Sequence, residues 1–162
     1  FETTDKELGV LSGLVNSAGI VAPFGRIDEV RAADLENLWA INITATMICS
    51  REAVRRMSTS HGGQGGAIVN LSSAAARLGT PNATVPYSAS KGAIDSFNWG
   101  LAQEVAGEGI RVNSVSPGVI DTEIQPAGRV EEMGPKLPMK RAGRPERSSV
   151  PAGCGGGGGG GV

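Results

Sequence analysis

Apolar and polar positions along the chain form blocks that predict strands and helices in turn. The apolar run "GVLSGLV" at residues 9–15 ends at the turn-forming sequence "NSAG", which is typical of a strand buried on both faces. From Ala33 to Met57, apolar residues recur every three or four positions, which predicts one long helix or two in succession. The run "AIVNLSS" at 67–73 follows the glycine-rich loop 61–66 and predicts a second buried strand.

The same alternation continues in the second half of the chain. Residues 87–106 contain no proline and place apolar side chains on one stripe, which predicts a helix that ends at "GEG". The sequence "IRVNSVSPG" at 110–118 then predicts a third strand followed by a proline–glycine turn. Strands that alternate with helices pair in parallel through right-handed crossovers. We therefore expect an α/β fold with an open, doubly wound parallel sheet and helices on both faces.

The last part of the chain has a different character. Beyond Asp121 prolines are frequent and periodic apolar residues are few, so we expect loop there. Seven successive glycines, from Gly155 to Gly161, cannot bury an apolar core. These patterns divide the chain into a folded domain at 1–146 and a disordered, glycine-rich tail at 147–162.

Composition limits the classes of partner. With 40% apolar and 19% charged residues, the chain has the composition of a globular domain. Fifteen basic and sixteen acidic residues leave a formal net charge of -1, which argues against binding to nucleic acid or to an anionic membrane. The two cysteines show neither disulfide nor metal-ligand spacing, and no apolar run is long enough to span a bilayer. These features indicate a cytoplasmic protein without a metal site, and a small molecule as its partner.

Candidate chemistry lies in "YSASK" at residues 87–91. Residues four apart lie on one face of a helix, so we expect Tyr87 and Lys91 to point in the same direction. A neighbouring ammonium stabilises a phenolate and lowers the pKa of the phenol, which makes a tyrosine a usable acid or base. Ser73 ends the adjacent predicted strand. We expect it to donate a hydrogen bond to the substrate oxygen whose proton Tyr87 gives or takes.

Five segments together resemble the short-chain dehydrogenase/reductase family. They are "LVNSAGI" at 14–20, "INITA" at 41–45, "IVNLSS" at 68–73, "YSASK" at 87–91 and "IRVNSVSPG" at 110–118, in the order and spacing of that family. The resemblance runs from about residue 8 to residue 146. It implies a Rossmann-type fold and an oxidoreductase that uses NAD or NADP. The implied reaction transfers a hydride between the nicotinamide ring and a carbonyl or secondary alcohol.

The resemblance also implies roles for individual residues. Tyr87 would be the general acid/base, and Lys91 would lower its pKa and bind the nicotinamide ribose. Ser73 would polarise the substrate carbonyl or hydroxyl, and Asn42 would hold a water that links Lys91 to solvent. The cofactor would also contact Asn16, Ala18 and Gly19 after the first predicted strand, and Pro117, Gly118, Val119 and Thr122 after the last.

The sequence departs from the family at both ends. No glycine-rich pyrophosphate turn of the type T-G-x-x-x-G-x-G precedes Leu8, so we expect the sheet to lack its first strands. The choice between NAD and NADP cannot be read for the same reason. After Glu146 no final helix and strand follow, which we attribute to a shifted reading frame or a truncated gene at about Arg147. The strand at 10–15 would then expose an edge, and we expect an unstable or aggregating chain.

Two alternatives stay open. A truncated, non-catalytic chain would at most bind a full-length relative, and the missing phosphate-binding turn favours it. An epimerase or dehydratase could use the same tyrosine and lysine, although "VNSVSPG" resembles the reductases. We expect the complete protein to be a homo-oligomer, because family members often pack the helices that correspond to 38–57 and 87–106 across a two-fold axis. The sequence does not identify the substrate.

Overall fold

The structure is a computed structural model that describes residues 1–21, 24–123, 125 and 127–147. The chain is divided into two units, Phe1–Pro117 and Gly118–Val162. The expected glycine-rich tail, apart from Arg147, lies outside the described residues.

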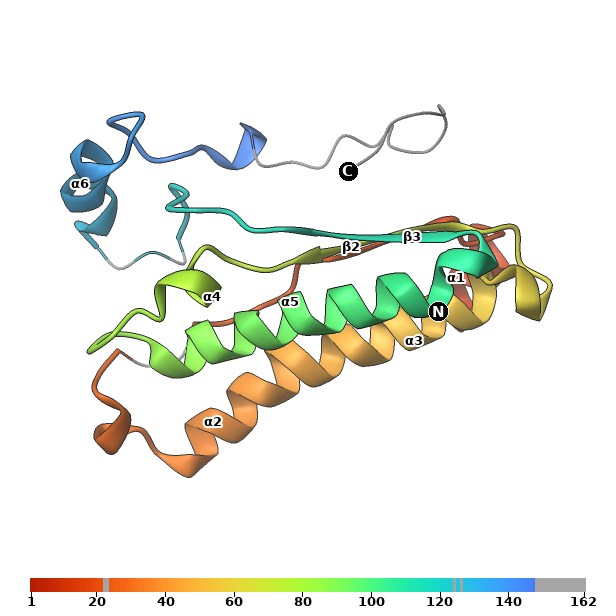
Figure 1. The fold of residues 1–162 in the computed structure, drawn as a ribbon, viewed down its shortest axis with the longest axis horizontal. Helices are drawn as coiled ribbons and strands as arrows, with labels where there is room; N and C mark the ends of the chain where they lie inside the picture. Colours follow the sequence, from red (N-terminus) through yellow and green to blue (C-terminus); the bar gives the residue numbers. More distant parts are fainter. Residues whose placement is uncertain (22–23, 124, 126, 148–162) are drawn as a thin grey trace. The chain divides into compact units, whose positions relative to one another are not determined.

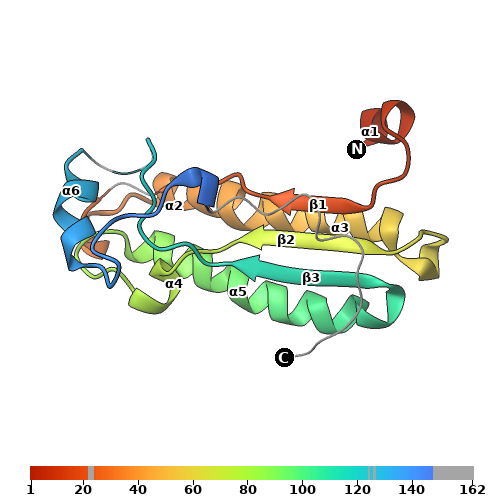
Figure 2. The same cartoon turned by 90° about the horizontal axis from the view of Figure 1, so that it is seen from above.

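In the described part of the first unit, three parallel strands pair in the order β1–β2–β3 (Figures 1 and 2). The strands span Gly13–Asn16, Gly66–Leu71 and Ile110–Val115. Their register pairs Asn16 with Asn70 and Leu71 with Val115, so the carboxyl ends of the strands lie at the same end of the sheet. The prediction of an α/β fold with a Rossmann-type parallel sheet is confirmed.

Helices form at the two places that the apolar pattern predicts, 33–57 and 87–106. The helices of the first unit are α1 (Glu2–Glu7), α2 (Ala32–Trp39), α3 (Ala45–Met57), α4 (Ala75–Leu78) and α5 (Val85–Val105), with short 3-10 turns at Ile27–Glu29, Thr59–His61 and Ala106–Glu108. The two short helices α1 and α4 were not predicted. A π-helical turn at Ala40–Thr44 joins α2 to α3, so the predicted segment 33–57 is helical throughout. Pro86 lies in the first turn of α5, where its missing N–H removes no intrahelical hydrogen bond.

The apolar core of the first unit lies between the sheet and the helices α3 and α5. Its buried residues are Ala53, Met57, Ile68, Val105, Ile110 and Val112. Figure 1 shows α2, α3 and α5 on one side of the strands. Among the described residues of this unit, no helix lies over the opposite face, where we expected a second helical layer (Figure 2). Val15 on the edge strand β1 is accordingly 54% exposed.

The second unit begins at Gly118 and contains a short helix, α6, which spans Arg129–Met133. Within this unit a parallel bridge pairs Ile120 with Gly143. Two 3-10 turns, Gly134–Lys136 and Pro145–Arg147, follow α6, so the described residues beyond Asp121 contain short helical segments where we expected only loop. An ion pair four residues apart, from the Lys136 ammonium to the Glu132 carboxylate at 2.7 Å, supports the turn that follows α6.

No helix in the described parts of the chain is both long enough and apolar enough to cross a membrane.

The edge strand β1 leads to a prediction about self-association. Replacing Val15 by lysine should raise the fraction of monomeric chain, because a charge on an edge strand opposes pairing with another chain. Size-exclusion chromatography over a range of concentrations measures this fraction. The matched control is Leu78→Lys, which places the same charge at a 71% exposed position on α4, away from the sheet edge. Equal effects of the two changes would contradict the role of the edge.

Candidate active site

The catalytic candidates of the sequence lie around the carboxyl end of β2 and the start of α5. Ser73 follows β2 by two residues, and Tyr87 and Lys91 lie in the first two turns of α5. Asn42 lies in the π-helical turn between α2 and α3, which contacts α5. All four residues belong to the first unit.

Tyr87 and Lys91 face each other, in agreement with their four-residue spacing. The Lys91 ammonium lies 5.8 Å from the centroid of the Tyr87 ring. The Lys91 side chain is buried, and its Nζ donates a hydrogen bond to the carbonyl oxygen of Leu71 at 2.7 Å. Ser72 Oγ donates to the backbone oxygen of Lys91 at 3.2 Å. These two bonds attach this turn of α5 to the end of β2.

Burial, rather than Lys91, has the largest effect on the pKa of Tyr87. Burial raises the pKa of Tyr87 above its ordinary value, and the interaction of its hydroxyl with Ser73 lowers this pKa in part. Burial also lowers the pKa of Lys91, and the charge of Asp95 partly offsets that effect. We expected Lys91 to lower the pKa of Tyr87, so the direction found for Tyr87 is the opposite one. The reason is that removal of a phenol from water disfavours its charged form.

Asn42 is buried and its side chain is engaged with protein groups. Its Oδ1 accepts a hydrogen bond from the backbone N–H of Ile20 at 2.8 Å, and its Nδ2 donates to the carbonyl oxygen of Ile20 at 2.9 Å. The same Nδ2 donates to Ser90 Oγ at 3.0 Å. Both amide hydrogens of Asn42 therefore have protein acceptors, and a water held by Asn42 stays a prediction. A π-helical turn is a frequent feature of functional sites, because its extra residue re-aims a side chain.

The segment after β1 passes close to the catalytic candidates. A Cβ atom at Gly19 would lie 3.4 Å from Asn42 Oδ1 and 3.5 Å from Lys91 Nζ. A methyl group at this position would be in van der Waals contact with both groups, so the backbone at Gly19 lies directly against them. Ala18 is exposed. Asn16 instead turns its side chain into the protein, where Nδ2 donates to Asn70 Oδ1 at 2.8 Å. A contact between Asn16 and a cofactor would therefore use its backbone.

The remaining cofactor candidates follow β3. Pro117 ends the first unit, and its carbonyl oxygen accepts a hydrogen bond from the backbone N–H of Ala74 at 2.9 Å. Gly118, Val119 and Thr122 belong to the second unit. Within that unit, the Val119 carbonyl accepts from the backbone N–H of Gly143 at 2.9 Å. The assignment of these three residues to the cofactor stays a prediction.

Several groups of the site were not identified from the sequence. The carbonyl of Leu71 and the backbone of Ile20 carry no sequence signal, because every residue has these groups. Asn98, in contrast, has a side chain that the sequence shows. It lies seven residues after Lys91, on the same face of α5, and its Oδ1 accepts a hydrogen bond from Asn70 Nδ2 at 3.1 Å. Its helical spacing could have revealed it.

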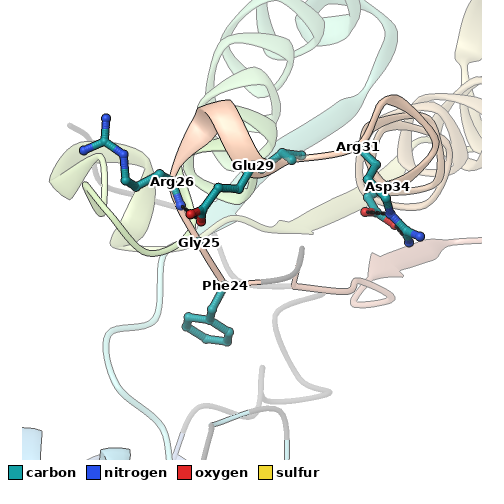
Figure 3. Close-up of a pocket in the computed structure, with 7 residues that line it drawn as sticks. Phe24, Gly25, Arg26, Glu29, Arg31 and Asp34 are labelled. Atoms are coloured by element: carbon teal, nitrogen blue, oxygen red, sulfur yellow. Dashed lines mark hydrogen bonds and ion pairs between the residues drawn. The ribbon is translucent and has the colours of Figure 1, made fainter.

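A separate pocket of about 270 Å³ is lined by the segment that precedes α2 and by the first turn of α2 (Figure 3). Its lining includes Phe24, Gly25, Arg26, Glu29, Arg31 and Asp34. The Arg31 guanidinium and the Asp34 carboxylate pair at 2.7 Å within it. None of the four catalytic candidates lines this pocket. In the described ranges, no cluster of histidine, cysteine and acidic side chains could hold a metal ion.

Comparison with known proteins gives a consistent set of relatives. A family model described as short chain dehydrogenase matches residues 1–132. The oxidoreductase YgfF of Escherichia coli K12 is 45% identical over 150 residues, which cover 90% of this chain and 61% of YgfF. The chain therefore spans about three fifths of the length of this relative.

Solved structures with the same arrangement are also found. The structure of ElxO with NADP bound has a TM-score of 0.79 and 31% identity, over 88% of this chain and 58% of ElxO. A dehydrogenase/reductase from Sinorhizobium meliloti 1021 has a TM-score of 0.81 and 32% identity, over 91% of this chain and 57% of that protein.

The pKa of Tyr87 can be measured directly, because Tyr87 is the one tyrosine in the sequence. A titration followed by the near-ultraviolet absorbance of the phenolate should give a midpoint above that of free tyrosine, since burial raises this pKa. Ser73→Ala should raise the midpoint further, because Ser73 lowers the pKa. The control is Ser114→Ala, at an exposed position of β3, which should leave the midpoint unchanged. A wild-type midpoint below that of free tyrosine would overturn the interpretation.

Proposed function

Because the chain belongs to the short-chain dehydrogenase/reductase family of oxidoreductases, we propose that its protein transfers a hydride between NAD or NADP and a carbonyl or secondary alcohol. The single observation that carries this proposal is the set of polar groups at the end of β2. Tyr87 and Lys91 face each other there, and Ser73 interacts with the Tyr87 hydroxyl.

The groups around Lys91 fit the ribose of a nicotinamide nucleotide. An ammonium has three N–H donors, and the hydrogen bond to Leu71 uses one of them. Gly19 has no side chain, and its backbone therefore lies close to this ammonium. We propose that the other two N–H donors of Lys91 bind the ribose hydroxyls, with Ala18 and Gly19 against the nucleotide. The NADP complex of ElxO supports a nicotinamide nucleotide as the ligand, since the fold of ElxO is similar to that of this chain.

The acid/base chemistry follows from the surroundings of Tyr87. A bound nicotinamide nucleotide would provide the hydride donor or acceptor. Burial raises the pKa of Tyr87, so the phenol carries its proton at neutral pH and can donate it to the oxygen of a carbonyl that is being reduced. Ser73 donates a hydrogen bond to the same oxygen as negative charge develops there. In the reverse direction, the ionised form of Tyr87 would accept the proton of the alcohol, so alcohol oxidation requires Tyr87 first to lose its own proton.

The complete protein is proposed to act on a small molecule as a cytoplasmic homo-oligomer. Exposed apolar side chains on the outer helices support an oligomer, because Trp99 on α5 is 73% exposed and Ile48 on α3 is also exposed. The free thiol of Cys49 accords with a reducing compartment.

Tyr87→Phe tests this function. The change removes the hydroxyl that moves the proton, and it should lower kcat by a factor of about 10² to 10⁴ while binding of NADH or NADPH persists. Steady-state oxidation of NADPH and NADH with a panel of small carbonyl compounds measures the rate, and nucleotide fluorescence measures binding. Unchanged turnover in the variant would contradict the role of Tyr87. Failure of the wild-type chain to bind either nucleotide would favour a non-catalytic chain that binds a full-length relative.

A further inference from the structure

We propose that Ser90 is a positioning residue. Through Asn42, it holds the segment after β1 in a fixed position relative to the turn of α5 that carries Tyr87. This inference rests on the function proposed above, since it concerns the alignment of the nucleotide site with the proton donor. The sequence offers Ser90 only as a small residue between Tyr87 and Lys91. Its hydrogen bonds indicate a more specific role.

Ser90 is fully buried, so its hydroxyl serves protein groups rather than a ligand. Ser90 Oγ donates a hydrogen bond to the carbonyl oxygen of Tyr87 at 2.7 Å. The same Oγ accepts a hydrogen bond from Asn42 Nδ2 at 3.0 Å. A hydroxyl has one hydrogen to donate, and the bond to Tyr87 uses it, so the lone pairs are left for Asn42. Ser90 thus connects α5 to the π-helical turn through one oxygen atom.

On its other side, Asn42 binds the backbone of Ile20 as a neighbouring strand would. It accepts from the N–H of Ile20 and donates to its carbonyl, at 2.8 Å and 2.9 Å. Gly19 precedes Ile20, and a Cβ there would be 3.4 Å from Asn42 Oδ1. A continuous series of hydrogen bonds therefore runs from the proposed nucleotide segment through Asn42 and Ser90 to the backbone of Tyr87.

Removal of the Ser90 hydroxyl breaks this series at its centre. In Ser90→Ala, one amide hydrogen of Asn42 loses its acceptor in a buried place, which weakens the hold of Asn42 on Ile20. Small displacements in an active site have large effects, because hydride and proton transfer both depend on distance. The segment with Gly19 would move relative to Tyr87, although neither residue is changed.

The neighbouring Ser88 provides a matched control. It lies in the same turn of α5 and is also buried. Its Oγ shares a hydrogen bond with Thr80 Oγ1 at 2.5 Å, in the segment that precedes α5, and not with Asn42. Ser88→Ala therefore removes a buried hydroxyl and one hydrogen bond from the same helix without touching the series through Ser90.

The experiment compares Ser90→Ala, Ser90→Thr and Ser88→Ala. Hydrogen exchange of the Asn42 side-chain amide, followed by NMR and assigned with Asn42→Asp, reports the bond without any need for activity. In Ser90→Ala we expect exchange to be faster by about tenfold or more. We also expect kcat for carbonyl reduction to fall by about tenfold or more. Ser88→Ala should leave both quantities within about twofold of wild type, and Ser90→Thr, which keeps the hydroxyl, should restore most of each.

The outcomes separate this inference from the proposed function. Unchanged exchange of Asn42 in Ser90→Ala would overturn it, and so would equal losses of kcat in Ser90→Ala and Ser88→Ala. If the wild-type chain shows no turnover, the proposed function fails. Even then, faster exchange of the Asn42 amide in Ser90→Ala, but not in Ser88→Ala, would support the positioning role of Ser90.

Discussion

The buried ammonium of Lys91 is the constraint on which the rest of the site depends. A charge removed from water is costly unless polar groups satisfy it, and the carbonyl of Leu71 does so at 2.7 Å. Leu71 ends β2, so this one bond fixes where α5 lies along the sheet. The hydrogen bond from Ser72 Oγ to the backbone oxygen of Lys91 is a second attachment of α5 to the end of β2. Tyr87 lies one helical turn earlier in α5, so these two bonds also fix the position of Tyr87.

The sequence predicts the elements well because their signals are local. The apolar run at 67–73 corresponds to β2 at Gly66–Leu71, and the proline-free stretch 87–106 corresponds to α5 at Val85–Val105. Binary patterns identify such segments, since a strand or helix presents its apolar face to one core. Whether a face of the sheet is covered depends on tertiary packing, and no local pattern contains that information.

The candidate site could be predicted as a set of residues but not as a set of contacts. The spacing of Tyr87 and Lys91 indicates their common face, and the resemblance to a family implies their roles. The pKa of Tyr87 could not be read in this way, because it depends on burial by residues distant in the sequence. The partners of Asn42 could not be predicted for a related reason, because the groups of Ile20 that it binds belong to the backbone. Tertiary contacts, rather than residue types, determine both properties.

Near the carboxyl ends of the strands, amide side chains form a partly buried row of hydrogen bonds, which we call the amide seam. Asn16 on β1 donates to Asn70 on β2, which donates to Asn98 on α5, and Asn16 also donates to Ser50 on α3 at 3.1 Å. Successive residues of a strand face opposite sides of the sheet, so a slip of β2 by one position would bring an aliphatic side chain to this seam and expel an amide from it. The amide seam therefore favours one register of β1 against β2. Hydrophobic packing alone would tolerate several alignments of so short a sheet, whereas matched amides accept one.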